Sequence, residues 1–160
     1  MRISPEIDNL NILNRRLGWI PSGDQIRPSQ VVVDKKEQDS IKFDKFYYSI
    51  KDQILIRYFK FPSKINRNTS RIESKILLEK IREKRFLKNE YAYNVPCETN
   101  HYVMWYTYQD ISDDNINLDI ENSLYELLKH RYFEFVWYEN PKMSVPDIYH
   151  VQVFWHLTNN

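Results

Sequence analysis

The sequence predicts an α+β fold: a single domain built on an antiparallel sheet flanked by helices, with a helical arm at its N-terminus. Three observations support this prediction. Segments rich in aromatic and β-branched residues, typical of strands, alternate with segments whose apolar residues recur at helical spacing. The order in the main domain is strand, helix, strand, helix, strand, strand, which favours antiparallel pairing. A chain of 160 residues with 42% hydrophobic residues is long enough to bury one core.

Residues 1–40 are expected to form the arm and a connector. Ser4 and Pro5 are typical of a helix start, and Gly18 is typical of a helix end. The turn-rich residues 19–30 then lead into the main domain. The apolar stripe of the arm consists of Ile7, Leu10, Leu13 and Leu17. Such a stripe must be buried against the chain's own domain or against a protein partner, so a partner bound through the arm is one expectation.

The main α+β domain is expected over residues 41–160. Its predicted strands are residues 46–61, 101–108, 133–138 and 148–156. A helix is predicted over about residues 71–86, because Ser70 and Glu73 have the spacing of a capping box. A second helix follows the acidic residues 110–114, which suit a helix N-terminus. Its predicted buried face consists of Ile120, Leu124, Leu127 and Leu128.

The scarcity of glycine and cysteine excludes several classes of protein. The only glycines are Gly18 and Gly23, and nucleotide-binding loops need glycine where the backbone approaches phosphates. P-loop, dinucleotide-binding and α/β-hydrolase motifs are therefore absent. The lone Cys97 excludes an internal disulfide and a cysteine-rich zinc site. We expect no metal and no cofactor. With no apolar run of about 18 residues and no secretory signal, we also expect a cytoplasmic protein without membrane contact.

Charge is unevenly placed along the chain. Residues 57–88 contain eleven Lys or Arg against three Asp or Glu, whereas residues 109–160 contain three against nine. One interpretation is a solvated helix face. The other is a patch that attracts phosphate, strengthened by the N-terminus of the predicted helix. In the second interpretation the ligand-binding cations are Lys64, Arg67 and Arg71, with Lys75 beside them.

The last predicted strand carries polar side chains where a core strand should be apolar. Alternation places His150, Gln152 and His156 on one face, and Tyr149, Val151, Val153 and Trp155 on the other. Either a site lies on the polar face or that face is wet. We predict that His101, His150 and Gln152 face one concave surface, and that Asn140, in the loop between the last two strands, borders it. A satisfied buried histidine is the structural alternative for His150.

Two segments carry a resemblance, NVPCETNHYVMWYT and FEFVWYENPKMSVPDIYHVQVF, both within residues 91–156. They resemble a family of fungi and giant DNA viruses whose named fungal members are the N-acetylglucosamine-induced proteins. That family has a His-Tyr-hydrophobic-hydrophobic-Trp strand, a helix, a Trp-aromatic-x-Asn segment and an aromatic-His strand. It implies no settled activity. The abundance of Asn, Ile, Lys and Tyr indicates an AT-rich genome and favours the viral branch, which implies host cytoplasm or virion.

The run YHVQVF also resembles the histidine-triad and galactose-1-phosphate uridylyltransferase group, which implies a histidine-triad-like sheet. In the triad register the nucleophile position falls on Gln152, and an amide cannot displace a phosphate. In the transferase register His150 is the nucleophile and Gln152 steadies the phosphate. The earlier histidine of that motif falls on Ile148, and the metal-binding cysteines of the transferase are absent.

The sequence is compatible with three functions. The first is a protein that binds a phosphate-bearing ligand (nucleotide, nucleotide-sugar or RNA) without robust catalysis. The second is a non-catalytic viral interaction or virion-associated protein. The third is a nucleotidyl hydrolase or transferase that uses His150.

Overall fold

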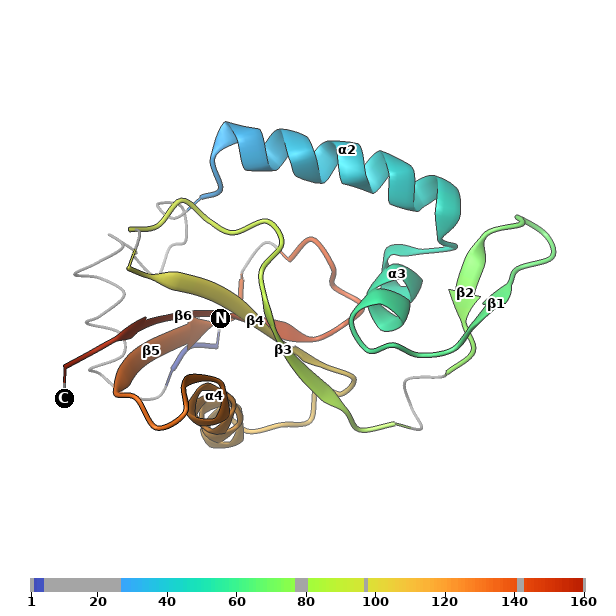
Figure 1. The fold of residues 1–160 in the computed structure, drawn as a ribbon. Coiled ribbons are helices and arrows are strands. Elements are labelled where there is room, and N and C mark those ends of the chain that lie inside the picture. Colours follow the sequence, from blue (N-terminus) through green and yellow to red (C-terminus); the bar gives the residue numbers. More distant parts are fainter. Residues whose placement is uncertain (1, 5–26, 77–80, 97, 141–142, 160) are drawn as a thin grey trace.

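A four-stranded antiparallel sheet lies between one helix on one face and two helices on the other (Figure 1). The computed structural model describes residues 2–4, 27–76, 81–96, 98–140 and 143–159. The described helices are α2 (Gln30–Phe46), α3 (Ile50–Arg57) and α4 (Asp113–Leu128). The described strands are β1 (Ser63–Ile65), β2 (Ile72–Ser74), β3 (Lys84–Lys88), β4 (Asn100–Tyr106), β5 (Phe133–Tyr138) and β6 (His150–Leu157). The α+β prediction is confirmed.

The main sheet has the strand order β3-β4-β6-β5, with every neighbouring pair antiparallel. Helix α4 connects β4 to β5, which are not neighbours in the sheet. Strand β6 lies between β4 and β5 as a central strand. A second, two-stranded sheet, β1-β2, projects from the side of the domain (Figure 1). The three strands predicted at 101–108, 133–138 and 148–156 correspond to β4, β5 and β6.

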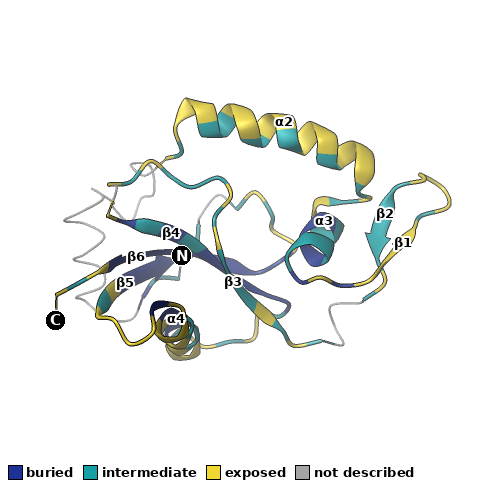
Figure 2. Ribbon diagram, in the orientation of Figure 1, coloured by how far each residue is buried: buried dark blue, intermediate teal, exposed yellow. Residues whose placement is uncertain are grey.

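Helix α4 covers one face of the main sheet and forms the larger core. Ser112 caps the helix by accepting a hydrogen bond from the Asn115 backbone N–H at 3.1 Å, and Lys129 ends it in the left-handed region at φ 49°. The buried helix face packs against alternate residues of β4, β5 and β6 (Figure 2). Its apolar residues are Ile116, Ile120, Leu124 and Leu128, and Asn117 is buried beside them. Leu127, predicted to be buried, is 46% exposed because it lies one position off this stripe.

The other face of the sheet is covered by α3, with α2 as the outermost layer. Ile54 and Leu55 of α3 pack on Val103 and Trp105 of β4. Helix α2 has no buried residue, and Figure 2 shows it as a largely exposed rod above the domain. It is held by polar contacts, among them Tyr91 Oη, which donates to Asp39 at 2.9 Å. Most of the stabilisation on this face therefore comes from α3.

The strand predicted at residues 46–61 is wrong. Residues 50–57 form α3, because Ser49 caps the first turn by accepting from the Asp52 backbone N–H at 3.0 Å. Asp52 also places a negative charge in that turn, where the helix dipole favours it. The β-branched and aromatic content of the segment favoured a strand, but the cap and the burial of one helical face against β4 override that propensity.

The helix predicted at 71–86 is also wrong. Residues 72–74 form β2, and residues 84–88 form β3; residues 77–80 lie outside the described part of the chain. Ser70 does not cap a helix: it has φ 61° and closes the β1-β2 hairpin. Glu73, expected as its capping-box partner, pairs instead across the hairpin with Lys64. The cross-strand pairs therefore replace the helical contacts that the spacing suggested.

The predicted arm falls mostly on residues 5–26, which lie outside the described residues. Ile3 forms an antiparallel bridge with Tyr138, and the Ser4 hydroxyl accepts from the Trp137 backbone N–H at 2.7 Å. The expected boundary between residues 40 and 41 falls within α2, Gln30–Phe46. None of the helices in the described ranges is long and apolar enough to cross a membrane.

Candidate functional site

His101 and Gln152 form a hydrogen-bonded pair in the interior. They come from neighbouring strands β4 and β6 and share one face of the sheet, as we predicted; this is the face opposite α4. The backbone N–H of Tyr93 donates to His101 Nδ1 at 3.0 Å. Because Nδ1 must accept, the ring proton lies on Nε2 and is donated to Gln152 Oε1 at 2.6 Å. Asn89 Nδ2 adds a longer contact to the same oxygen at 3.4 Å.

The His101 ring is enclosed by aromatic rings. It stacks on Phe154 at 4.4 Å between centroids, and the Tyr93 ring lies 4.5 Å away. Only 2% of His101 and 6% of Gln152 is exposed. Burial lowers the pKa of His101 to about 4, against the smaller raising effect of the Gln152 hydrogen bond. The imidazole is therefore neutral at pH 7, and the polar pair is a satisfied part of the core.

Asn140 joins the same network from the loop after β5. Its Nδ2 donates to Tyr93 Oη at 3.0 Å, so Tyr93 links Asn140 to His101. Burial raises the pKa of the Tyr93 hydroxyl, which keeps it protonated at pH 7. Sequence reasoning missed Tyr93 and Asn89, because both lie in loops without strand periodicity. The only available signal was the polar, turn-forming composition around Asn89.

His150 lies apart from this network. It is opposite Trp105 on β4, whereas His101 is opposite Phe154 on β6, so the two histidines are separated by four residues along the strands. At about 3.3 Å per residue this is roughly 13 Å, beyond the reach of one small ligand. The structure therefore brings together His101, Gln152 and Asn140, and leaves His150, which lies two residues from Gln152 on the same face of β6, out of reach of His101.

The His150 ring has the protonation pattern of a nucleophilic imidazole but little access. Nδ1 lies 2.8 Å from the carbonyl oxygen of Ile148, so Nδ1–H donates and Nε2 keeps its lone pair. Burial, reinforced by the positive charge of Lys36 on α2, lowers the pKa of His150. The ring stacks on Trp105 at 4.4 Å and is only 4% exposed. His156, at the far end of β6, instead contacts Glu134 at 2.9 Å.

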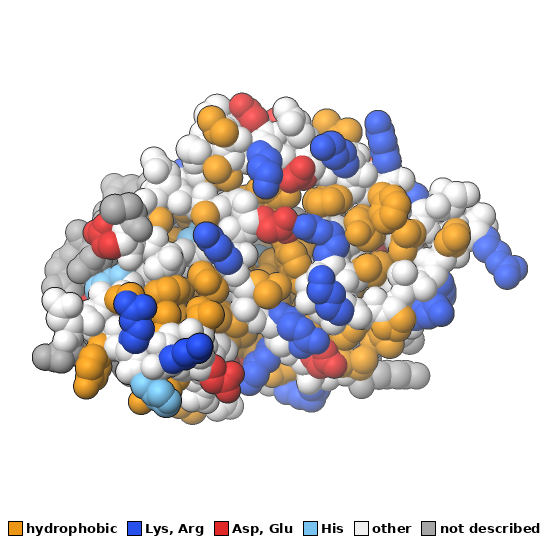
Figure 3. All heavy atoms as spheres, in the orientation of Figure 1, with side chains coloured by type: hydrophobic (Ala, Val, Ile, Leu, Met, Phe, Trp, Pro, Cys, Tyr) orange, Lys and Arg blue, Asp and Glu red, His pale blue; other side chains and the backbone are white. Residues whose placement is uncertain are grey.

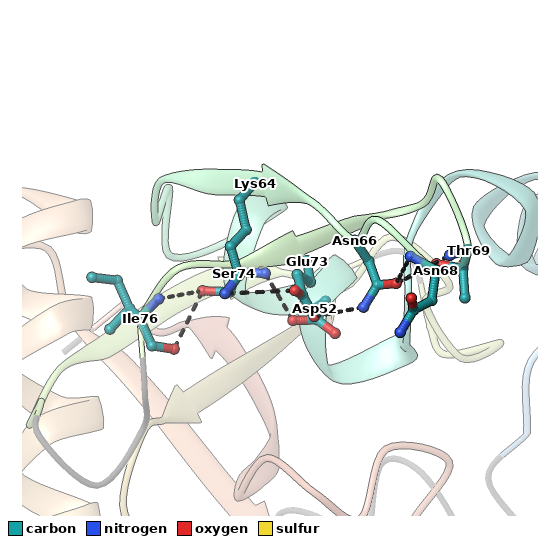
Figure 4. Close-up of polar contacts among 8 residues, drawn as sticks. All are labelled: Asp52, Lys64, Asn66, Asn68, Thr69, Glu73, Ser74 and Ile76. Atoms are coloured by element: carbon teal, nitrogen blue, oxygen red, sulfur yellow. Dashed lines mark hydrogen bonds and ion pairs between the residues drawn. The ribbon is translucent and has the colours of Figure 1, made fainter.

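Lys64, Arg67 and Arg71 lie on the β1-β2 hairpin and not at a helix N-terminus. Figure 4 shows how its turn is held: Asn66 Oδ1 accepts from the backbone N–H groups of Asn68 and Thr69 at 3.0 and 3.1 Å. Lys64 lies 3.6 Å from Glu73 across the hairpin. The hairpin is therefore a fixed projection with Arg67 in its turn.

The four cations in and beside the hairpin differ in how far they are neutralised. Arg71 donates from Nη1 to the Asp44 carbonyl oxygen at 2.9 Å and lies 3.7 Å from the Asp44 carboxylate. Lys64 is paired with Glu73 as described. Arg67 is exposed and has no ion pair with any residue that the structure describes, and the same holds for Lys75. Of these four, Arg67 and Lys75 are thus the cations most available to an anion.

A pocket of about 300 Å³ lies elsewhere, at the end of β4 near the start of β6. Its lining includes Tyr106, Tyr108, Tyr149 and Arg82. The Arg82 guanidinium is held by both carboxylate oxygens of Asp110, at 2.8 and 3.0 Å, and lies over the Tyr108 ring. No predicted site residue lines this pocket. Across the described ranges, no group of three or more His, Cys, Asp or Glu could hold a metal ion.

Comparisons with known proteins give one distant structural likeness. No protein-family model matches the sequence, and no curated protein is significantly similar to it. A solved structure described as "Crystal Structure of HTC1" is similar to this chain with a TM-score of 0.43 and 12% sequence identity. The similarity covers 82% of this chain and 76% of that chain. A likeness at this level carries no functional argument, so the function is inferred from the geometry of this chain.

Proposed function

We propose that the chain binds a phosphate-bearing ligand (a nucleotide, a nucleotide-sugar or RNA) on its projecting hairpin. The binding surface is residues 44–52, at the junction of α2 and α3, together with residues 63–75; we name it the basic hairpin surface. These residues include six Lys or Arg against three Asp or Glu. The cations are Lys45, Lys51, Lys64, Arg67, Arg71 and Lys75. A phosphate chain is the ligand class whose charge complements such a surface.

The observation that supports the proposal best is the excess of cations without an ion pair, among the described residues, on the projecting β1-β2 hairpin. Figure 3 shows Lys and Arg side chains gathered over β3, α3 and the hairpin on this side of the molecule. Several of these pair with carboxylates: Arg57 with Glu90, Lys84 with Asp119 and Arg85 with Glu83. Arg67 and Lys75, by contrast, keep their charge for a ligand. A two-stranded ribbon is also an element that nucleic-acid-binding proteins present to their ligands.

The test compares two double variants that each remove two positive charges. Arg67→Gln with Lys75→Gln alters the hairpin, and Lys129→Gln with Arg131→Gln removes the same charge from exposed positions after α4. Binding of labelled RNA and labelled ATP is measured by fluorescence anisotropy from low to high salt. We expect the hairpin variant to weaken RNA binding and to reduce the slope of log K against log salt by about 2. The control variant should bind as the wild type does.

Two outcomes would overturn the proposal. One is the absence of salt-sensitive binding by the wild type. The other is an equal loss in both double variants, because that would show a net-charge effect and not a site. Normal melting temperatures of both variants, measured by circular dichroism, would establish that each is folded.

One contact favours a second candidate, nucleotidyl hydrolysis or transfer by His150. The hydrogen bond from Nδ1 to Ile148 leaves Nε2 free to attack a phosphorus, as the transferase resemblance implies. Against it, Gln152, the residue that would steady the phosphate, is already bound to His101. We expect nucleotides and nucleotide-sugars to show no turnover with the wild type. Turnover that is lost in His150→Asn and kept in His130→Asn, an exposed histidine, would replace the first proposal with this one.

A further inference from the structure

Two aromatic side chains stand exposed within the basic hairpin surface. Phe46, the last residue of α2, is 55% exposed, and Tyr48, in the connection to α3, is 43% exposed. The Arg71 guanidinium lies 5.8 Å from the Tyr48 ring centroid. Burial of apolar surface stabilises a fold, and these two exposed rings contribute only part of the stabilisation that full burial would give. Exposed rings interleaved with cations are typical of surfaces that bind single-stranded nucleic acid.

The rings are fixed in position relative to the hairpin cations. The Tyr48 backbone N–H donates to the Ile72 carbonyl oxygen of β2 at 2.7 Å, and Tyr47 forms a parallel bridge with the same residue. Arg71 in turn donates to the Asp44 carbonyl oxygen. The segment 44–48 is therefore attached along the edge of β2 that does not pair with β1. This attachment places stacking groups and phosphate-binding groups on one rigid unit, with little ordering required on binding.

We infer that the basic hairpin surface binds single-stranded nucleic acid, with bases stacked on Phe46 and Tyr48 and phosphates contacted by Arg67 and Lys75. This inference rests on the proposed function and narrows its ligand class. A duplex keeps its bases stacked on each other, so it offers phosphates but no free base faces to these rings. A linear polyphosphate offers charge alone. A single strand offers both charge and unstacked bases, and it uses both features of this surface.

The probes separate stacking from charge. They are a fluorescein-labelled oligouridylate of about 12 nucleotides, a duplex of the same length and inorganic polyphosphate as a competitor. The wild type should bind the single strand more tightly than the duplex at equal salt. Phe46→Ala and Tyr48→Ala should each weaken single-strand binding by about tenfold, with the salt slope unchanged. Tyr48→Phe, which keeps the ring, should bind as the wild type does.

The control removes exposed rings from another part of the molecule. Tyr125 lies on α4 and is 52% exposed, and Tyr132 follows α4 and is 62% exposed. Replacing either residue by alanine should leave the affinity for the single strand unchanged. Equal affinity for single strand, duplex and polyphosphate, with no effect of Phe46→Ala, would overturn the inference and leave the proposed function standing. If none of the three probes shows salt-sensitive binding, both the inference and the proposed function are overturned.

Discussion

Replacing His101 by asparagine is expected to remove a large part of the acid sensitivity of this fold between about pH 6.5 and pH 4. His101 is enclosed by Phe154 and Tyr93, and burial lowers its pKa to about 4. Protonation would place a second N–H on Nδ1, directly opposite the Tyr93 N–H that now donates to it. The charged ring thus loses a hydrogen bond as well as its hydration.

The sign of the effect follows from which state binds the proton. In the folded state His101 is unprotonated down to about pH 4, whereas in the unfolded chain it takes up a proton below about pH 6.5. Between these values the unfolded state binds more protons, so the free energy of unfolding falls as the pH falls. Its loss across the window is about 3 kcal/mol and is complete below the folded pKa. His150, whose pKa is also lowered by burial, acts in the same direction.

Urea unfolding, followed by circular dichroism between pH 4 and pH 7.5, gives the pH dependence of the free energy of unfolding for the wild type and for each variant. His101→Asn supplies a non-titrating acceptor for Tyr93 and loses the stacked ring, so its stability at pH 7 should be lower and its pH dependence flatter. His130→Asn removes an exposed histidine and should keep the wild-type pH dependence. A pH slope in His101→Asn as steep as that of the wild type would show that another group causes the acid sensitivity.

The C-terminal half of the fold could be predicted because its local signals agree with its tertiary contacts. Strand β5 has the predicted bounds, and β4 and β6 differ from prediction by only one or two residues at each end. The alternation in β6 predicted that Val151 and Val153 share the face opposite His150 and Gln152, and in the structure that face packs on α4. In these segments turn residues, period-2 alternation and burial point to one structure.

The N-terminal half was mispredicted where local signals conflict. Residues 50–57 have strand propensity, but the Ser49 cap and the packing of Ile54 and Leu55 on β4 favour a helix. Residues 72–74 have the spacing of a capping box, but the turn held by Asn66 closes a hairpin before a helix can begin. Neither outcome depends on composition. Both depend on a local cap or turn together with contacts between segments, and a reading of hydrophobic periodicity includes neither.

The site was only half predictable for the same reason. The prediction that His101 and Gln152 share one face was correct, yet strand parity does not tell which strands are neighbours or in which register they pair. The pairing of Val103 with Gln152 sets the contact between Gln152 and His101, and the pairing of Trp105 with His150 sets His150 apart. Likewise, charge composition identified the basic segment, but the hairpin that projects its cations is set by cross-strand contacts.

Leu124→Ala is expected to lower the free energy of unfolding by about 3 kcal/mol, and Leu127→Ala by about 0.5 kcal/mol or less. The two residues share one side-chain type and one helix, and the sequence pattern assigned both to the buried face. The structure separates them: Leu124 is 0% exposed in the core under α4, whereas Leu127 is 46% exposed. Truncating Leu124 removes buried methyl groups and leaves a cavity among Ile120, Leu128 and the sheet residues, because the strands beneath cannot collapse into it.

The pair is its own control for helix propensity, since both variants replace leucine by alanine in the interior or last turn of α4. Urea unfolding at pH 7 gives the two free energies under identical conditions. Both variants should keep the nucleic-acid affinity of the wild type while folded, because α4 lies on the face of the sheet opposite α3 (Figure 1). Equal losses of stability in the two variants would mean that α4 is rotated about its axis from the orientation described. A larger loss in Leu127→Ala would mean that Leu127, and not Leu124, faces the core.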